Sequence, residues 1–326
     1  AQIGMKYGLF NRKKISYKEL KKIEKLVLKS NIHFIDTAKS YGASEKIIGK
    51  SKLKNLNIIT KIKLPRKKII FIRDWILKEI LSSLKKLKVK NIYGILIHDY
   101  KDLSGKHGKI YLDCLRDLKR KNIIKKIGIS VYSPHEIKKI WKFWKPDLVQ
   151  VPFNLLDNRI LDSGWIDILK RSKVKIFARS IFLQGLLINE NSFLKMNKNY
   201  LILFNKIKNW CYKNNISLIQ ACLHFVKQFK KIDFLVVGFD NFNQLNEIIN
   251  VFKKKQIKIP KKFSTNKINL IGIYNPESIE ILLVTVKLSF RVKRLSESTK
   301  LPTAIEPLPL ILMLSVISKK DSLSPV

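Results

Sequence analysis

An eight-stranded parallel α/β barrel, the (β/α)8 or TIM barrel, is the fold class that three features of this 326-residue sequence predict. Short apolar runs alternate with longer helical stretches along the first 260 residues, which is typical of βαβ units and a parallel sheet. Eight apolar runs can be counted, and each is followed by a helical stretch, as in this barrel. An open doubly wound sheet is the competing architecture, but the GxGxxG motif that usually follows its first strand is missing.

The predicted strands are apolar runs of four to seven residues, at 1–4, 33–36, 57–62, 92–98, 126–130, 148–153, 174–179 and 234–238. The predicted helices lie between them, at 16–30, 44–50, 74–87, 110–121, 134–143, 159–172, 200–214 with 217–229, and 241–252. Several helices begin at a plausible N-cap. Ser16, for example, is followed three residues later by Glu19, which is the pattern of a capping box.

The sequence changes character after about residue 260. The regular alternation stops, six of the ten prolines lie from Pro260 to Pro325, and Ser and Thr become frequent. The run 279–292 could form a strand or two, but it has no evident place in the barrel. We therefore expect residues 1–260 to form the barrel and 261–326 to be an appended, irregular and poorly ordered tail.

The net charge of +42 has two interpretations. One is a nucleic-acid or anionic-membrane partner. The other is compositional bias, since lysines crowd the polar faces of nearly every predicted helix instead of forming one patch. The sequence contains no helix-turn-helix, aromatic RNA-binding signature or zinc finger. We therefore expect no specific nucleic-acid partner.

The three cysteines, Cys114, Cys211 and Cys222, have neither the spacing of a metal site nor that of a disulfide framework. This indicates a protein without a bound metal, in a reducing cytoplasmic setting. The most apolar run, 308–317, is too short to span a membrane, and the N-terminus has no signal-peptide pattern. We expect no membrane partner, and a monomer or a weak oligomer.

Four polar residues stand at or just after the carboxyl ends of three consecutive predicted strands. Asp36 ends one strand and Tyr41 follows it, Lys61 ends the next, and His98 ends the third. Neighbouring strands of a barrel lie about 4.8 Å apart, and their carboxyl ends share the rim where barrel active sites are found. Each residue alone has an ordinary structural explanation, but four at successive strand ends indicate one site.

These residue types suit the reduction of a carbonyl group. Hydride addition places negative charge on the carbonyl oxygen, so an acid must deliver a proton, and Tyr41 is available for this. An ammonium group such as that of Lys61 stabilises a neighbouring phenolate. Asp36 would pair with Lys61 and orient it, and His98 can donate a hydrogen bond to the carbonyl oxygen.

The segment 31–49, NIHFIDTAKSYGASEKIIG, resembles the signature of the aldo-keto reductases, in which Asp-Thr-Ala-x-x-Tyr-Gly precedes Ser-Glu and a helix. Further matches follow in the family's order, at 60–61, 98, 128–130, 150–154, 179–187, 237–238 and 244–245. The resemblance spans residues 1 to about 252. It is greatest to a bacterial branch whose members often act in sugar or surface-polysaccharide pathways.

The resemblance implies a catalytic tetrad of Asp36, Tyr41, Lys61 and His98, and NADPH or NADH as cofactor. It implies that Ser130 and Gln150 hold the nicotinamide carboxamide and that Arg179 packs on the nicotinamide ring. Other positions would surround the rest of the cofactor. Those expected at the pyrophosphate are Ser180, Ile181, Phe182 and Gln184, and those expected at the adenosine phosphate end are Gly238, Asn241 and Gln244.

The sequence departs from the family pattern in three places. Asp240 stands where many NADPH-specific members carry Arg or Lys, so a preference for NADPH is in doubt. Val131 replaces the Asn that normally follows the serine of the fourth family motif. The opening strand is cut short, so we expect a truncated N-terminal strand.

The leading hypothesis is therefore an NAD(P)H-dependent enzyme that reduces an aldehyde or ketone, with a sugar-derived carbonyl compound as the expected substrate class. The alternative is a catalytically silent barrel that binds the cofactor as a regulatory or binding subunit. A nucleic-acid-binding protein recruited by charge is a third, weaker hypothesis. The expected walls of the substrate pocket are Tyr7, Trp75, Tyr100, Phe153 and Phe182.

Overall fold

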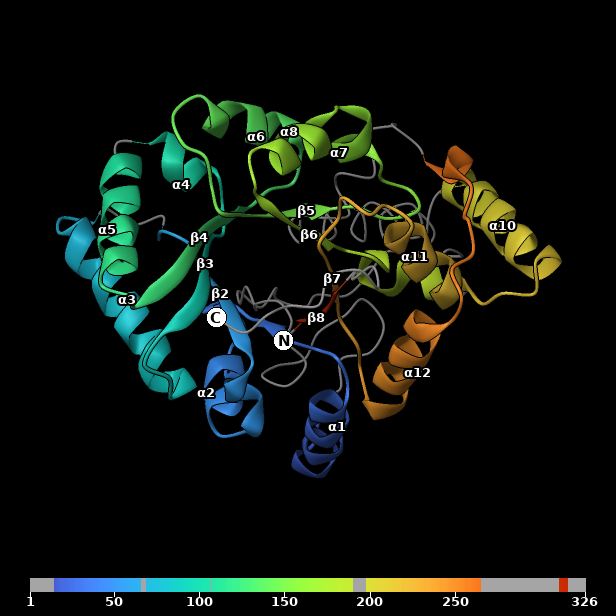
Figure 1. Cartoon of the computed structure of the whole chain (residues 1–326), viewed down its shortest axis with the longest axis horizontal. Helices are drawn as coiled ribbons and strands as arrows, with labels where there is room; N and C mark the ends of the chain where they lie inside the picture. Colours follow the sequence, from blue (N-terminus) through green and yellow to red (C-terminus); the bar gives the residue numbers. More distant parts are fainter. Residues whose placement is uncertain (1–14, 66–68, 106, 190–197, 265–310, 316–326) are drawn as a thin grey trace, which may run out of the picture.

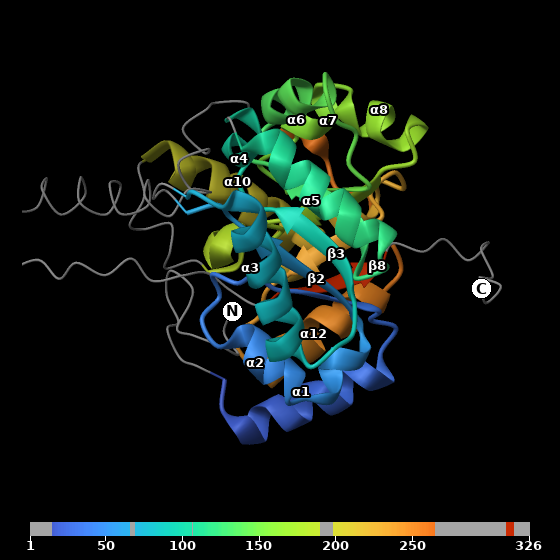
Figure 2. The same ribbon diagram turned by 90° about the vertical axis from the view of Figure 1, so that its left-hand side faces the viewer.

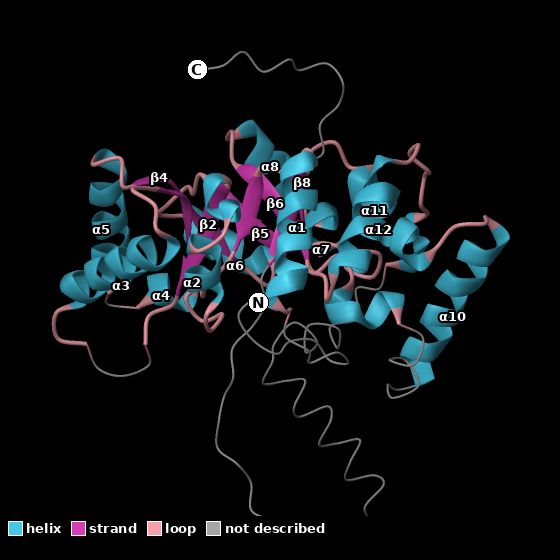
Figure 3. Ribbon diagram, turned by 90° about the horizontal axis from the view of Figure 1, so that it is seen from below, coloured by secondary structure: helices cyan, strands magenta, loops and turns pink. Residues whose placement is uncertain are grey.

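The computed structural model describes residues 15–65, 69–105, 107–189, 198–264 and 311–315. Its strands form a closed barrel in the order β1 to β8. Figure 1 shows the strands at the centre with the helices around them, and Figure 3 shows the same enclosure from below. The strands are β1 Phe34–Asp36, β2 Asn57–Ile62, β3 Ile92–Ile97, β4 Ile124–Ser130, β5 Leu148–Pro152, β6 Lys175–Arg179, β7 Phe234–Val237 and β8 Ile311–Ser315.

The helices follow the strands in the alternation that the sequence predicts. They are α1 Tyr17–Lys29, α2 Ser44–Gly49, α3 Ile72–Leu87, α4 Lys101–Ser104, α5 Gly108–Arg120, α6 Pro134–Trp141, α7 Arg159–Asp162, α8 Trp165–Arg171, α10 Lys198–Lys213, α11 Leu218–Lys227 and α12 Phe242–Lys253. Three short 3-10 helices, Lys52–Asn55, Leu183–Ile188 and Lys261–Phe263, complete the set among the described residues. Ser16 caps α1 as predicted, because its hydroxyl accepts a hydrogen bond from the amide of Glu19 at 3.2 Å.

The predicted (β/α)8 class is confirmed, with two differences in detail. The predicted helix 159–172 is broken into α7 and α8 at Gly164, whose φ of 72° is a conformation that glycine adopts without strain. Strands β1 to β7 pair in parallel, whereas β8 runs antiparallel to both β7 and β1. The predicted strand 1–4 lies outside the described residues.

Strand β8 corrects the expectation that the segment after residue 260 has no role in the barrel. Ile311–Ser315 pairs with all four residues of β7 and with all three of β1. A strand edge left unpaired would expose a row of amide and carbonyl groups, and this short apolar run covers the two edges that β1 and β7 would otherwise present. The stretches 265–310 and 316–326 lie outside the described residues, so the proposed boundary near residue 260 stays a prediction.

Two apolar clusters hold the described barrel together. The larger one lies between the strands and the outer helices, and it is rich in Ile and Leu. The smaller one fills the barrel interior, and its members come one from each of six strands: Phe34, Ile59, Leu96, Leu148, Phe177 and Val236. We call it the inner cluster. Gly128 makes room for it, because a β-carbon there would lie 2.5 Å from the carbonyl oxygen and 2.7 Å from the β-carbon of Leu148.

Helices α1 and α12 lie side by side on the outside of the barrel (Figures 1 and 2). The contact includes a hydrogen bond of 2.9 Å from the amide of Phe242, the first residue of α12, to the Glu19 carboxylate of α1. None of the helices among the described residues combines the length and the apolar character that a membrane crossing requires.

Candidate active site

A polar layer lies directly above the inner cluster. Each residue of the inner cluster is followed two positions later in the chain by a residue that the sequence analysis placed in the site. Because side chains alternate between the two faces of a strand, residues two apart point to the same side, here the barrel interior. The layer consists of Asp36, Lys61, His98, Gln150, Arg179 and Gly238, one residue from or just after each of six strands.

Asp36, Lys61 and Tyr41 are in direct contact. The ammonium group of Lys61 donates a hydrogen bond to Oδ2 of Asp36, within an ion pair whose two side chains are almost completely buried. The same ammonium lies 3.5 Å from the Tyr41 hydroxyl and 3.2 Å from the backbone oxygen of Thr37. Three of the four predicted tetrad residues are thus joined through one buried ammonium.

Burial and the neighbouring Asp36 carboxylate shift the pKa of Lys61 in opposite directions. Burial lowers the pKa of Lys61, because removal from water disfavours the charged form. The Asp36 carboxylate raises the pKa through its charge and its hydrogen bond, and the Arg179 guanidinium lowers it further. The direction that results is a pKa below the ordinary value for lysine.

The loop that carries Tyr41 is fixed by backbone and side-chain bonds. The Thr37 amide extends the β1–β2 ladder by donating to Ile59 O at 2.8 Å, and the chain then turns so that the Tyr41 amide donates to Ala38 O at 3.0 Å. Gly42 follows at a φ of 55°. The Lys39 side chain ties the loop to α3 through an ion pair of 2.6 Å with Glu79. Tyr41, which is 4% exposed, is therefore held in a defined place beside Lys61.

His98 follows β3, the strand next to the one that carries Lys61. Its amide donates to Ile62 O at 2.9 Å, which continues the β2–β3 ladder one residue past β3. Its ring meets the Tyr41 ring edge-on, with 6.4 Å between the centroids. Burial, reinforced by the charges of Lys61 and Arg179, lowers the pKa of His98 to about 3. The imidazole is therefore neutral at neutral pH and has one N–H to donate.

Ser130 and Gln150 are paired across β4 and β5, so their side chains share one side of the sheet. Gln150 donates from Nε2 to Asp36 Oδ1 at 3.0 Å, which leaves its amide oxygen as an acceptor. The buried Ser130 hydroxyl has no hydrogen-bond partner among the described residues. One free hydroxyl beside one free amide oxygen matches the donor and acceptor needs of a primary carboxamide. The two side chains therefore fit the nicotinamide of the expected cofactor.

Arg179, which the sequence places at the nicotinamide ring, ends β6 and crosses to the neighbouring loop. Its guanidinium donates to Val131 O and to the Ser180 hydroxyl, both at 3.1 Å, and it lies 4.6 Å from the centre of the Tyr132 ring. The loop beyond it has an unusual backbone, with positive φ at Ser180, Leu183, Gln184 and Gly185. Of the residues predicted at the pyrophosphate, Ile181 and Phe182 belong to this loop and are buried.

The residues predicted at the adenosine phosphate end lie together at the start of α12. The Asn241 side chain accepts a hydrogen bond from the Gln244 amide at 2.9 Å, and Gln244 Oε1 accepts one from the Asp240 amide at 2.5 Å. Both side chains thus cap the helix. A β-carbon at Gly238 would meet nothing within 4 Å, so space lies open beside this turn.

The predicted substrate-pocket residues are not brought together in one wall. Phe153 is fully buried and packs against Phe225 and Phe229 in the outer core, so it does not line a pocket here. Trp75 and Tyr100 are partly buried against the same core, and Tyr7 lies outside the described residues. The expectation is therefore corrected for Phe153, because it follows Val149 and Val151 at intervals of two residues, and these side chains face the outer core.

Two residues that contact the candidate site, Thr37 and Tyr132, were not identified from the sequence. Thr37 bonds Lys61 through its backbone oxygen and Ser44 through its hydroxyl at 3.0 Å. Tyr132 supports Arg179 by ring stacking. Thr37 lies inside the segment 31–49 that resembles the family signature. Tyr132 follows Val131, which departs from the family pattern. Both positions could therefore have been singled out from the sequence. Which atoms they would contact depends on loop geometry that sequence spacing does not contain.

The closed barrel with converging polar side chains at the carboxyl ends of its strands is the architecture of a TIM-barrel enzyme. The chain belongs to the aldo/keto reductase family, because the model of that family matches residues 2–264. It is therefore an NAD(P)-dependent oxidoreductase, as the sequence predicts, and its cofactor is NADPH or NADH.

Solved structures of the same family share the fold. Aldo-keto reductase AKR11C1 of Bacillus halodurans is 16% identical in its holo form, with a TM-score of 0.61 over 82% of this chain and 88% of that one. Its apo form is 17% identical, with a TM-score of 0.60 over the same shares of the two chains. A Pseudomonas aeruginosa protein assigned to the aldo-keto reductases is 18% identical, with a TM-score of 0.57 over 77% and 86%. No curated protein matches the chain.

Proposed function

We propose that the chain reduces an aldehyde or ketone to an alcohol, with Tyr41 as the proton donor. The single observation that carries the proposal is the buried contact of the Lys61 ammonium with both the Asp36 carboxylate and the Tyr41 hydroxyl. The cofactor supplies the hydride when it is bound. The chain supplies the proton and the electrostatic stabilisation, and the roles below follow from these contacts.

Tyr41 gives its phenolic proton to the carbonyl oxygen as negative charge develops there. The phenolate that remains is stabilised by the ammonium 3.5 Å away, in a site from which water is largely excluded. Asp36 holds the ammonium in place, since its two carboxylate oxygens are bound by Lys61 and by Gln150. The neutral His98 donates its N–H to the same carbonyl oxygen and orients the substrate.

Ser130 and Gln150 hold the nicotinamide carboxamide in this proposal. Arg179 lies beside the nicotinamide ring, the loop 180–184 lies over the pyrophosphate, and Gly238, Asn241 and Gln244 receive the adenosine end. Anions are favoured at a helix N-terminus such as that of α12. The sugar-derived substrate, the cytoplasmic setting and the monomeric or weakly oligomeric state stay predictions, as does the absence of a specific nucleic-acid partner.

The test measures the oxidation of NADPH or NADH by a generic aldehyde. The readout is the loss of absorbance of the reduced nicotinamide. The wild-type chain should turn over. Lys61→Met should lower kcat by about a hundredfold or more, because the phenolate loses its ammonium neighbour. Lys63→Met is the matched control, since this lysine lies two residues along the chain, is half exposed and pairs with Asp99. The kcat of Lys63→Met should stay within about twofold of the wild-type value. A wild-type chain that binds the cofactor without any turnover would favour the silent regulatory barrel instead.

A further inference from the structure

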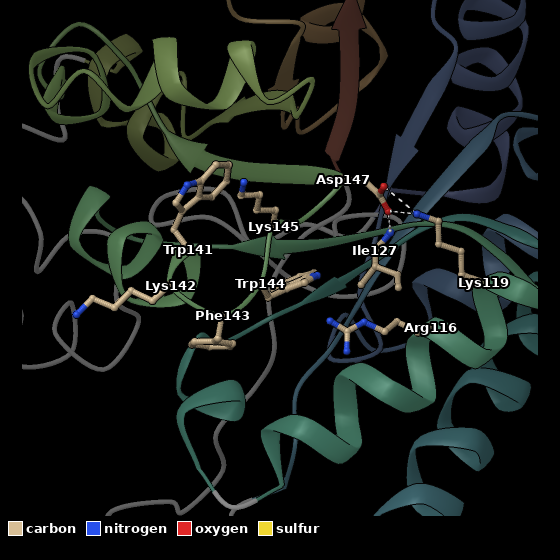
Figure 4. Close-up of a pocket in the computed structure, with 9 residues that line it drawn as sticks. All are labelled: Arg116, Lys119, Ile127, Trp141, Lys142, Phe143, Trp144, Lys145 and Asp147. Carbon is tan, nitrogen blue, oxygen red and sulfur yellow. Dashed lines mark hydrogen bonds and ion pairs between the residues drawn. The ribbon is translucent and has the colours of Figure 1, made fainter.

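A pocket opens at the end of the barrel opposite the candidate active site. Its volume is about 530 Å³, and it lies between α5 and the connection from α6 to β5 (Figure 4). Asp147, which borders it, precedes the first residue of β5, whereas the tetrad lies at the carboxyl ends of its strands. The volume is within the range of about 300 to 1,000 Å³ that small-molecule sites occupy.

Three aromatic side chains from one short segment form one side of this pocket. They are Trp141, Phe143 and Trp144. Trp144 is buried and fixed, with its amide bonded to Ile140 O at 2.9 Å, and Trp141 packs edge-on against Trp165 at 5.5 Å. Phe143, in contrast, is 54% exposed. The pocket therefore presents one exposed ring, Phe143, beside two rings that the fold holds in place.

Cationic side chains surround the aromatic ones. Lys142 and Lys145 come from the same segment as the rings, and Figure 4 shows Arg116 and Lys119 of α5 facing them from the other side. The one carboxylate in the lining, Asp147, is already bound by Lys119 at 2.7 Å and by the Ile127 amide at 2.8 Å. Arg116 is likewise paired, with Asp113 at 2.9 Å, so the net positive charge of the pocket comes from Lys142 and Lys145.

The two lysines of the segment are available to a ligand. Neither Lys142 nor Lys145 takes part in an ion pair within the described part of the chain. The Lys145 ammonium lies 5.7 Å from the centre of the Trp141 ring, so an aromatic face and a cation are presented together. A second cavity of about 500 Å³ shares Arg116 and Lys119 with the first. Its other lining residues are Arg120 and the carboxylates Asp113 and Asp117, which pair with Arg116 and Arg120, so the uncompensated positive charge is confined to the first pocket.

We propose that this pocket binds a nucleotide unit, with a planar base against the aromatic side chains and a phosphate on Lys142 and Lys145. Bases stack on aromatic side chains irrespective of their sequence, and phosphates bind lysine and arginine. A carboxylate peptide would use the cations but not the rings, and an apolar ligand would use the rings but leave the cations unmatched. The nucleotide is either free or part of a single strand, and the site is separate from that of the nicotinamide cofactor.

The test uses the full-length protein with one equivalent of NADPH, because an excess of NADPH, which is itself a nucleotide, would compete with the probes for the proposed pocket. Binding of AMP and of a fluorescent single-stranded oligoadenylate is measured for wild type and for Phe143→Ala/Lys145→Ala. The matched control is Tyr212→Ala/Lys213→Ala on α10, which removes an aromatic residue that is more exposed than Phe143 and one positive charge, far along the chain from the pocket. Inorganic polyphosphate, which has phosphates but no base, serves as the second probe.

We expect the pocket variant to weaken oligoadenylate binding about tenfold or more and the control variant to weaken it less than about threefold. AMP binding that the pocket variant also loses would identify a free nucleotide as sufficient, whereas loss for the strand alone would identify a single-stranded nucleic acid. Lys142→Ala/Lys145→Ala, which changes only exposed side chains, should act in the same direction. Equal losses in the pocket and control variants, no loss in either, or an equal loss for polyphosphate would overturn the proposal.

Discussion

The inner cluster and the polar layer above it are built from the same six strands and differ by two residues in each. In the inner cluster the residues are apolar and pack against one another and against neighbouring aromatic rings, as where Phe177 stacks on Phe234 at 4.7 Å. In the polar layer the side chains are charged or hydrogen-bonded, and the contacts run from Lys61 to Asp36 and on to Gln150. The residues that stabilise the barrel and those that form the candidate site therefore lie in adjacent layers of one barrel.

The largest effect should come from emptying the inner cluster. Phe177→Ala removes a fully buried ring that contacts Phe34 and Phe234, and it should lower the free energy of unfolding by about 3–5 kcal/mol. Phe143→Ala, at a half-exposed ring, should change it by less than about 0.5 kcal/mol. Urea titration measures both. A loss in Phe177→Ala no greater than in Phe143→Ala would mean that the inner cluster does not hold the barrel.

The polar layer should show its own effect as a dependence of stability on pH. The pKa of His98 is about 3 in the folded chain, below the value of 6.5 for a free histidine. As pH falls through 6.5 the unfolded chain takes up a proton that the folded chain does not, so the folded state loses stability. Between pH 6.5 and 3, wild type should lose up to about 1.4 kcal/mol per pH unit more than His98→Gln.

Above pH 6.5 this difference should not change with pH, because His98 is then neutral in both states. Unfolding of the two proteins at a series of pH values supplies the measurement, and other titrating groups cancel in the difference. Parallel curves for wild type and His98→Gln across the acid range would show that His98 is not shielded from water.

The smallest effect concerns the cofactor at the edge of the polar layer. In the proposed binding mode the 2′-phosphate of NADPH lies at the start of α12, where Asp240 precedes the cap residue and the Glu19 carboxylate accepts from the Phe242 amide. A like charge there is worth about 1 kcal/mol or more, so NADPH should bind no more than about tenfold more tightly than NADH. Asp240→Asn should shift the ratio of the two dissociation constants toward NADPH. Fluorescence titration with each cofactor measures the two dissociation constants. A strong NADPH preference in the wild type would show that Asp240 does not repel the 2′-phosphate.

The sequence predicted seven strands within two residues at each end, because alternating apolar runs and N-cap residues are local signals. It also predicted which four residues meet at one rim, since parallel strands end on the same side. It did not find β8. The run 308–317 contains Ile311–Ser315 but was considered only as a membrane segment, and its partners β7 and β1 lie far away in the chain. Pairing over such a distance leaves no local pattern.

The candidate site shows the same division. The Lys61–Asp36 pair followed from strand ends and complementary charge. The stacking of Arg179 on Tyr132 did not, because it depends on how two loops turn beyond their strands. Phe153 was misplaced for a different reason: the alternation along β5 sends Val149, Val151 and Phe153 to the outer core, and the sequence analysis did not apply it.

The central claim, that Tyr41 gives the proton, is tested most directly by single-turnover reduction of an aldehyde by Tyr41→Phe with bound cofactor. The substitution keeps the buried ring and removes only the hydroxyl beside Lys61. The rate should fall by about a hundredfold or more, with the cofactor dissociation constant within about twofold of wild type. Tyr93→Phe, one level down beside the inner cluster, should react at the wild-type rate. A Tyr41→Phe protein that keeps nearly full single-turnover activity would contradict the claim, because the proton would then come from another group.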